Sequence, residues 1–378
     1  MDLDFDQPFE FRDALVNGPA HRRGAGLNPG NRFEPVRLHV LGEELDRQWI
    51  EREDADGKLR RVERQVFTDN TQTIINRVAK TSDVPFDWTV NPYRGCEHGC
   101  IYCFARPFHE YLGFSSGLDF ETKIVAKPHA AALLKKELAA SSWNGEPIVM
   151  SAITDVYQPL EHSMRLTRHC LEVMAQCGQP VSTMTKSAMV LRDTDLWQEL
   201  ARKNAGRVIV TLVTLDAELA EKLEPRASAP SARLRIIREL TGAGVPVTVN
   251  VAPVIPGLTD AEMPAILKAV ADAGAQRAAW ALLRLPYQLK ELFVDWLQRS
   301  VHPDRARKVE SLIRQMHAGK LYDAARDLRG RGRGVHADQL AQTFDVFTRR
   351  YGLNRDVRSL TSSNFKRPAL DSQLSLFS

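Results

Sequence analysis

Between residues 84 and 300, short apolar runs alternate with amphipathic segments, and this alternation constrains the fold more than any other feature. The runs are rich in β-branched residues, as strands are, and the segments between them have the apolar spacing of helices. Strands that alternate with helices form βαβ units, whose strands lie parallel in one sheet. The predicted strands occupy residues 86–92, 147–154, 180–186, 208–215, 245–254 and 278–285. The predicted helices between them begin near residue 127 and occupy residues 165–176, 193–203, 232–243 and 260–274.

Six such units are too few for a closed eight-stranded barrel. They predict an α/β fold, a partial (β/α)6 TIM-like barrel over residues 84–300, with its site at the C-terminal ends of the strands. Residues 1–83 are predicted as an irregular N-terminal arm, with small paired strands within 37–68. Residues 301–359 are predicted as a helical C-terminal extension, with helices at 304–318, 321–329 and 336–352. Residues 360–378 are predicted as a flexible tail.

The net charge of +4 conceals an uneven distribution along the 378 residues. Residues 1–80 carry 13 basic and 15 acidic side chains, and residues 81–300 carry 23 and 24. Residues 301–378 carry 15 basic and 8 acidic side chains, so the basic excess lies in the predicted extension and tail. Four arginines cluster around glycines there, where a phosphate backbone could approach closely: Arg326, Arg329, Arg331 and Arg333. A solvated arginine-rich loop is the alternative interpretation.

The cellular location is predicted from what the sequence does not contain. The acidic start of the chain has no apolar segment typical of a signal peptide, and no window of 18 apolar residues predicts a membrane span. Five cysteines, three of them between residues 96 and 103, do not form the dispersed, even set of a secreted disulfide scaffold. We therefore expect a cytoplasmic protein with one clustered-cysteine site and no membrane contact.

The three clustered cysteines are Cys96, Cys100 and Cys103, on a loop directly after the first predicted strand of the barrel. Thiolates are soft ligands that suit iron–sulfur clusters or zinc. Three of them can hold three irons of a [4Fe–4S] cube, which leaves the fourth iron open to a chelating substrate. The alternative is a zinc site with three cysteines and His98, although zinc sites normally take their ligands from two separated pairs.

The C-x3-C-x2-C spacing, with Tyr102 before the last cysteine and βα units after it, resembles the radical S-adenosylmethionine (SAM) superfamily over residues 84–300. The resemblance implies a [4Fe–4S] cluster on Cys96, Cys100 and Cys103, with SAM on the open iron and Tyr102 among the cofactor-binding residues. Reductive cleavage of SAM would then give a 5′-deoxyadenosyl radical that abstracts a hydrogen atom. An electron donor such as flavodoxin or ferredoxin is implied as well.

The resemblance extends to the ends of other predicted strands. Residues 253–260, PVIPGLTD, match the family's adenine-packing pattern at Ile255 and Gly257 and depart from it at Pro253 and Asp260. The other cofactor-binding candidates are polar residues at strand ends. Ser151, Thr154 and Asp155 are the candidates for the methionine amino group, and Thr214 and Asp216 are those for the ribose. A strand-to-helix turn capped by Thr259 or Asp260 is the alternative interpretation of residues 253–260.

Further segments resemble the spore photoproduct lyase-like branch of that superfamily: residues 23–34, 91–107, 154–161, 185–197, 252–260 and 332–339. This branch implies radical chemistry on nucleic acid, with DNA favoured. A true lyase returns hydrogen through a cysteine, whereas this chain has none between Cys103 and Cys170. Tyr102 and Tyr157 are therefore candidate radical relays, and Lys186 is a candidate to hold a carboxylate or phosphate at the mouth of the barrel.

Residues Gln373–Phe377, QLSLF, resemble the short peptide with which bacterial polymerases and repair enzymes dock on the sliding clamp. Leu376 and Phe377 would be its apolar anchors. Two other functions remain open at this point. One is a non-catalytic, metal-stapled protein that binds DNA or accompanies the clamp, and the other is a radical enzyme that acts on RNA or protein.

Overall fold

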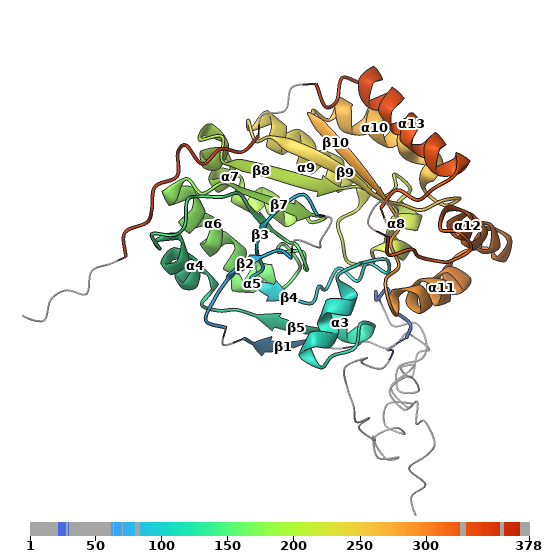
Figure 1. The fold of residues 1–378 in the computed structure, drawn as a ribbon, viewed down its shortest axis with the longest axis horizontal. Helices are drawn as coiled ribbons and strands as arrows, with labels where there is room; N and C mark the ends of the chain where they lie inside the picture. The colour runs from blue at the N-terminus through green and yellow to red at the C-terminus, as the bar shows by residue number, and fades with distance from the viewer. Residues whose placement is uncertain are drawn as a thin grey trace, which may run out of the picture.

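The computed structural model describes residues 22–27, 29, 62, 64–69, 71–79, 84–325, 330–355 and 359–370. Its main sheet has seven strands in the order β10-β9-β8-β7-β6-β3-β2 (Figure 1). Six of them are parallel and coincide with the six predicted strands, which confirms the α/β partial-barrel prediction. The parallel strands are β3 (Trp88–Val90), β6 (Ile148–Met150), β7 (Val181–Thr185), β8 (Gly206–Thr211), β9 (Val247–Val254) and β10 (Arg277–Leu282).

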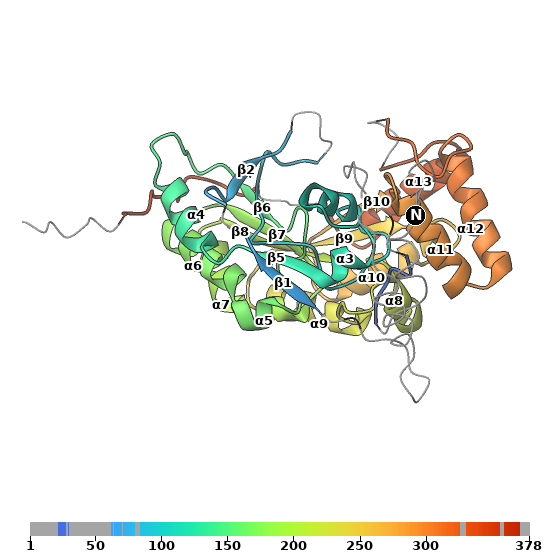
Figure 2. The same ribbon diagram turned by 90° about the horizontal axis from the view of Figure 1, so that it is seen from below.

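Helices cover the outer face of this sheet (Figure 2). The strands present alternate faces, so that Val208 and Val210 of β8 pack with Ile236 and Leu240 in the buried core beneath the helices. The opposite face of the strands lines the interior of the partial barrel. The covering helices are α4 (Ala130–Leu138), α6 (Leu166–Cys177), α7 (Thr194–Arg202), α9 (Pro230–Gly242) and α10 (Met263–Asp272).

Part of the predicted N-terminal arm belongs to the sheets. Strand β2 (Ile75–Arg77) pairs antiparallel with β3 and extends the main sheet. Strand β1 (Gln65–Thr68) pairs in parallel with β5 (Lys123–Ala126), which also pairs with β4 (Tyr93–Arg94). The predicted pairing within 37–68 thus gives way to a more distant partner for β1, and residues 37–61 lie outside the described residues.

The helical extension forms around α12 (Pro303–Met316) and α13 (Val335–Arg350), preceded by α11 (Leu289–Ser300). The helix predicted at 321–329 is absent over Leu321–Ala325, while residues 326–329 lie outside the described residues. Asp323 Oδ1 accepts a hydrogen bond from the Ala325 N–H at 3.0 Å, a local turn that competes with helix formation. No helix in the described part of the chain is long and apolar enough to cross a membrane.

The first part of the predicted flexible tail is held in place instead. The Lys366 N–H donates to the Cys177 carbonyl at 2.8 Å. The Arg367 guanidinium donates to the carbonyls of Ala140, Ser141 and Trp143 at 2.9–3.2 Å. Residues 359–370 therefore form a strap across loops between the strands and helices, whereas Gln373–Phe377 lie outside the described residues.

Short helical segments complete the chain between these elements. They lie in the loops that follow the strands, where the sequence shows little periodicity. They are η1 (Arg106–Leu112), α3 (Leu118–Thr122), α5 (Glu161–Met164), η2 (Ala188–Asp193), α8 (Ala217–Leu223) and η3 (Asp260–Glu262).

Candidate functional site

The cysteine loop, residues 95–103, follows β4 and is held by backbone hydrogen bonds at both ends. The Cys96 N–H donates to the Phe120 carbonyl at 2.9 Å, and the Ile101 N–H donates to the Leu223 carbonyl at 3.0 Å. Gly99 takes a φ of +68°, and a Cβ there would lie 2.8 Å from the Glu121 carboxylate. Only glycine meets both demands without strain, so the loop conformation depends on this position.

A cavity of about 330 Å³, the cysteine cavity, opens beside this loop at the C-terminal ends of the parallel strands. Its volume falls within the range of roughly 300–1,000 Å³ typical of ligand sites. The site therefore lies where the partial-barrel prediction expects it. Cys96, Cys100 and Cys103 all line the cavity.

The three cysteines are free thiols, and Cys96 and Cys100 are buried. Burial raises the pKa of Cys100 to about 12, although the charge of Lys186 lowers it. Burial also raises the pKa of Cys96. Since metal ligation requires the thiolate, these thiols stay protonated at neutral pH without a metal, and a bound metal would displace their protons to solvent.

The cysteine arrangement fits a polynuclear cluster better than a single ion. Within the described ranges, no three His, Cys, Asp or Glu side chains converge closely enough to hold one metal ion. A zinc site of three cysteines and His98 would need such convergence. The three thiols line one cavity, where each cysteine would bind a different iron of a [4Fe–4S] cube.

His98 is instead paired with Asp155 beside the cavity. Its Nδ1 lies 3.2 Å from Asp155 Oδ2, and both side chains are buried. The same carboxylate accepts hydrogen bonds from the Thr185 hydroxyl and the Lys186 N–H, both at 2.9 Å. Burial by itself would raise the pKa of Asp155, but His98 and the Lys186 N–H lower it below its usual value. An ionised Asp155 thus ties the ends of β6 and β7 to the cysteine loop.

Tyr102 is anchored on the other side of the loop by a buried ion pair. Its hydroxyl donates to Glu224, whose other oxygen accepts from Arg233. Burial would raise the pKa of Glu224, but Arg233 and Lys186 hold it below its usual value. The Lys186 ammonium lies 5.8 Å from the centre of the Tyr102 ring. The ring therefore has a fixed position at the cavity wall.

Several of the remaining candidates line the cysteine cavity. Ser151, Thr154 and Lys186 do so from the ends of β6 and β7. The Thr154 hydroxyl donates to the Gly95 carbonyl at 2.6 Å, so Thr154 also supports the cysteine loop. Ser151 has a φ of +79° and shares a hydrogen bond of 2.8 Å with the Thr183 hydroxyl.

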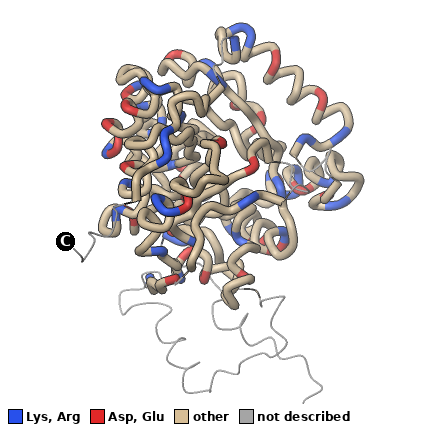
Figure 3. Tube along the Cα trace, turned by 60° about the vertical axis from the view of Figure 1, so that its left-hand side comes forward, with Lys and Arg blue, Asp and Glu red and all other residues tan. Residues whose placement is uncertain are grey.

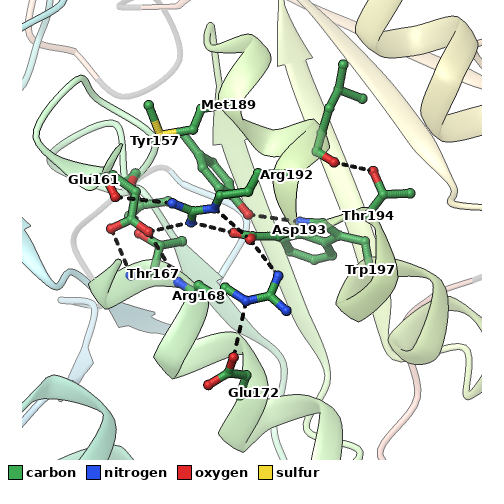
Figure 4. Close-up of polar contacts among 12 residues, drawn as sticks. Tyr157, Glu161, Thr167, Arg168, Glu172, Met189, Arg192, Asp193, Thr194 and Trp197 are labelled. Carbon is green, nitrogen blue, oxygen red and sulfur yellow. Dashed lines mark hydrogen bonds and ion pairs between the residues drawn. The ribbon is translucent and has the colours of Figure 1, made fainter. Parts of the chain in front are cut away.

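Tyr157 lies away from the cavity, in a buried polar cluster (Figure 4). Its hydroxyl accepts from Trp197 Nε1 at 3.0 Å, and Arg192 donates nearby to Glu161 and Asp193. This cluster joins two of the segments on which the family resemblance rests, 154–161 and 185–197. Those segments contribute to the packing between α5, η2 and α7. The buried Tyr157 is not among the residues that line the cysteine cavity, and its role as a relay stays a prediction.

The other four candidates also lie outside the cavity lining. The Thr214 hydroxyl donates to Glu262 at 2.6 Å. Asp216 caps α8 by accepting from the N–H groups of residues 218 and 219. Ile255 is fully buried in the core near α11 and α12, and the Gly257 carbonyl accepts from Arg305 Nε at 3.3 Å. Thr214, Asp216, Ile255 and Gly257 thus contact neighbouring parts of the fold, and their roles in cofactor binding stay predictions.

Sequence reasoning missed other cavity residues, among them Asn250, Pro253, Arg284 and Phe104. Asn250 is the one amide side chain within the apolar run of β9, and this position could have identified it as a candidate site residue from the sequence. Its position two residues before Ala252 places both on the inner face. Arg284 lies 5.8 Å from the centre of the Phe104 ring, a long-range contact that local pattern does not reveal.

Comparisons with known proteins agree with this geometry. Residues 90–270 match the family model described as the radical SAM superfamily. An uncharacterized protein of Mycobacterium tuberculosis is 38% identical over 246 residues, which span 65% of this chain and 72% of that protein. The radical SAM Nalpha-GlyT isomerase of Pseudomonas phage M6 is 23% identical over 252 residues, spanning 66% of this chain and 49% of that protein. A spore photoproduct lyase mutant with dinucleoside spore photoproduct has a similar fold, with a TM-score of 0.56 at 15% identity over 82% of this chain and 93% of that chain.

Proposed function

The chain belongs to the radical SAM superfamily, and on that premise we propose that it is an enzyme acting on nucleic acid, with DNA as the favoured substrate. The family's cofactors are a [4Fe–4S] cluster, which Cys96, Cys100 and Cys103 would hold, and SAM. Together they supply a 5′-deoxyadenosyl radical that abstracts a hydrogen atom from the substrate. The protein's own residues orient the substrate and exclude water from the site.

One hydrogen bond carries the nucleic-acid proposal. The Leu282 N–H, at the end of β10, donates to the Gly330 carbonyl at 2.9 Å. Leu282 lines the cysteine cavity, and Gly330 begins the described part of the basic loop that contains Arg331 and Arg333. The Arg333 N–H donates to the Met316 carbonyl at 3.0 Å, so the loop is fixed beside the cavity.

Figure 3 shows Lys and Arg interspersed with Asp and Glu along the chain, so the position of particular arginines is more informative than the overall charge. Arg331 and Arg333 are exposed next to the cavity. They can hold a phosphate backbone while a base reaches the cysteine cavity. Arg326 and Arg329 of the same cluster lie outside the described residues.

The cavity wall has side chains suited to a base. Phe104 is 41% exposed and lies under the Arg284 guanidinium at 5.8 Å. An aromatic face and a guanidinium plane both stack on bases of any sequence. Lys186, whose pKa is held above its usual value by Cys100 and Glu224 against the effect of burial, adds a permanent cation at the same wall.

Solved structures of similar fold support the same substrate class. The solved lyase structures include one with bound AdoMet and dinucleoside spore photoproduct. The proposal covers the substrate class and not the lyase reaction, because the chain has no cysteine between Cys103 and Cys170 to return hydrogen as a true lyase does.

The proposal is tested by anaerobic turnover of the reconstituted full-length protein with SAM and dithionite. Ultraviolet-irradiated DNA, untreated DNA, RNA and a peptide mixture are compared by the 5′-deoxyadenosine released above the substrate-free background. We expect stimulation by DNA, and loss of all release with Cys100→Ala. Release that RNA or peptides stimulate and DNA does not would overturn the DNA proposal, and release by no form of the protein would favour a non-catalytic binding role.

A matched pair of variants isolates the basic loop. Arg331→Gln with Arg333→Gln should weaken stimulation by DNA and leave the substrate-free background unchanged, because neither side chain lines the cysteine cavity. Arg235→Gln with Arg238→Gln removes the same charge from exposed positions on α9. Equal effects of the two double variants would contradict a specific role of the loop.

The sliding clamp is the partner proposed for residues Gln373–Phe377. The strap is hydrogen-bonded to the barrel as far as Arg367, so the peptide begins six residues beyond that contact. Deletion of residues 373–377 should abolish binding of the purified bacterial clamp in a pull-down and leave 5′-deoxyadenosine release from free oligonucleotide unchanged. Clamp binding that survives the deletion would contradict this proposal.

A further inference from the structure

An exposed aromatic surface begins at the wall of the cysteine cavity. Five Phe, Tyr or Trp side chains are exposed in the described part of the chain, and four of them lie in two short segments, 104–111 and 284–287. The fifth, Phe67, is on β1. We call the four residues of the two segments the aromatic surface. They are Phe104, Phe108, Tyr111 and Tyr287, with exposed fractions of 41%, 46%, 64% and 59%.

The geometry of η1 places two of these rings on one face. In a 3₁₀ helix such as η1, residues three apart lie on the same face. Ala105, the residue before η1, lines the cysteine cavity, and Phe108 and Tyr111 follow it at that spacing. The centres of the two rings are 6.3 Å apart. The exposed face of η1 therefore leads outward from the cavity.

The opposite face of η1 is anchored to the rest of the fold. Arg106 is fully buried, and its guanidinium donates to the Cys100 carbonyl at 2.9 Å. Gln288 Nε2 donates to Glu110 Oε1 at 2.7 Å, which ties η1 to the segment that carries Tyr287. The backbone under the rings is thus already ordered, so a ligand does not bear the cost of ordering it.

The segment that follows β10 connects the aromatic surface to the basic loop. At its start, the Leu282 N–H donates to the Gly330 carbonyl of that loop at 2.9 Å. Two residues later, the Arg284 guanidinium lies 5.8 Å from the centre of the Phe104 ring, and Gln288 reaches η1. Cations suited to phosphates and rings suited to bases therefore lie along one stretch of chain beside the cavity.

We propose that the aromatic surface stacks on the bases that neighbour the reacting base, and that the substrate is bound as a single-stranded or locally unpaired nucleic acid. The bases of a duplex are stacked on one another, so only bases that have left the duplex can stack on Phe108 and Tyr111. Stacking on aromatic rings tolerates any base sequence. The inference rests on the proposed action on nucleic acid, and it holds for DNA and RNA alike.

The test measures binding of a labelled oligothymidylate to the full-length protein by fluorescence anisotropy at constant ionic strength. An oligomer of the same length with abasic sugars keeps the phosphates and lacks the bases. We expect the oligothymidylate to bind roughly tenfold more tightly than the abasic oligomer, because only the former can stack. Equal affinities of the wild type for the two oligomers would overturn the proposal.

A pair of variants assigns the effect to the rings. Phe108→Ser with Tyr111→Ser should weaken binding of the oligothymidylate roughly tenfold, and should leave binding of the abasic oligomer and of a blunt duplex unchanged. Phe108→Tyr with Tyr111→Phe is the matched control, because it keeps both rings and should bind as the wild type does. Arg331→Gln with Arg333→Gln should instead weaken binding of both oligomers alike. An unchanged affinity of the serine variant for the oligothymidylate would overturn the proposal.

The remaining outcomes separate this inference from the proposed function. Both substituted side chains are exposed, so the Tm of the serine variant should be unchanged, and Phe108→Ser alone replaces it should it fail to fold. Release of 5′-deoxyadenosine that DNA stimulates, without base-dependent binding, would overturn the aromatic surface and leave the proposed function standing. Base-dependent binding without stimulated release would support the surface and overturn the proposed function. Slower reduction by flavodoxin in the serine variant, with unchanged oligonucleotide binding, would assign the surface to a protein partner and overturn the proposal.

Discussion

Gly24 lies directly against the cysteine loop, since a Cβ at residue 24 would lie 2.0 Å from the carbonyl oxygen of Gly99. Glu121 holds the two segments together. Its carboxylate accepts hydrogen bonds from the N–H groups of Gly24 and Ala25 at 3.1 and 2.9 Å, and Arg106 pairs with it from below the loop. The short described segment of the N-terminal arm is therefore part of the support for the cysteine loop.

Gly24→Ala should accordingly displace the cysteine loop. Forcing a methyl group into a closed backbone contact costs roughly 1–3 kcal/mol and shifts the backbone around it. We expect a lower Tm and a reduced iron content after anaerobic reconstitution, measured by thermal unfolding and iron analysis. Gly242→Ala is the matched control, because a Cβ there meets no atom within 4 Å. Full iron content in Gly24→Ala would contradict this role.

Glu224→Gln should destabilise the protein through its two buried partners. The substitution leaves the Arg233 charge buried without a carboxylate, and breaking a buried pair in this way costs about 3–5 kcal/mol. Glu239→Gln on α9, which breaks the exposed pair with Arg235, should cost about 0–1 kcal/mol. Urea unfolding at neutral pH measures the free energy of unfolding of both variants. Equal losses of this free energy would mean that the Tyr102–Glu224–Arg233 group does not stabilise the fold.

His109 should make the free energy of unfolding depend on pH. Burial lowers its pKa to about 4 from an ordinary value near 6.5, so the folded state disfavours the protonated ring. As the pH falls from about 6.5 to about 4, the unfolded chain takes up the proton first, and stability is lost over that window. His109→Gln should flatten this part of the profile, measured by urea unfolding at several pH values. His169→Gln, at an exposed position on α6, should leave the slope unchanged, and an unchanged slope in His109→Gln would refute the prediction.

Arg367→Ala should loosen the C-terminal strap. The guanidinium bridges the carbonyls of Ala140, Ser141 and Trp143, and the loss of such hydrogen bonds costs roughly 1–3 kcal/mol. Deletion of residues 371–378 removes none of these contacts and should leave the Tm unchanged. Thermal unfolding measures the Tm of both proteins. An unchanged Tm in Arg367→Ala would mean that the strap lies on the barrel without stabilising it.

The barrel strands could be predicted from sequence because each is a short apolar run bounded by helical pattern. The six predicted runs correspond to β3, β6, β7, β8, β9 and β10. Short elements such as α8 and η1 were missed, since seven residues show too little periodicity. The helix expected at 321–329 fails over Leu321–Ala325 because Asp323 closes a local turn. The strap could not be predicted, because its hydrogen bonds join residues more than 150 positions apart, such as Asn364 and Lys203.

For the site, cysteine spacing was the informative signal, because ligands close in sequence reveal their chemistry without the fold. Ser151, Thr154 and Lys186, chosen for their positions at strand ends, line the cavity, and their roles there stay predictions. It gave no way to see that Thr214 and Asp216 have partners of their own in Glu262 and the start of α8. Arg284 depends on its contact with the distant Phe104, which no local pattern encodes.

The most direct measurement is isotope transfer from the proposed substrate. The reconstituted protein is turned over anaerobically with SAM, dithionite and DNA prepared from cells grown in deuterated medium, and the 5′-deoxyadenosine is analysed by mass spectrometry. A radical that abstracts hydrogen from DNA transfers deuterium, so we expect 5′-deoxyadenosine heavier by one deuterium, and none with Cys100→Ala. Abundant 5′-deoxyadenosine without deuterium, from DNA treated or untreated with ultraviolet light, would contradict the assignment of DNA as the substrate.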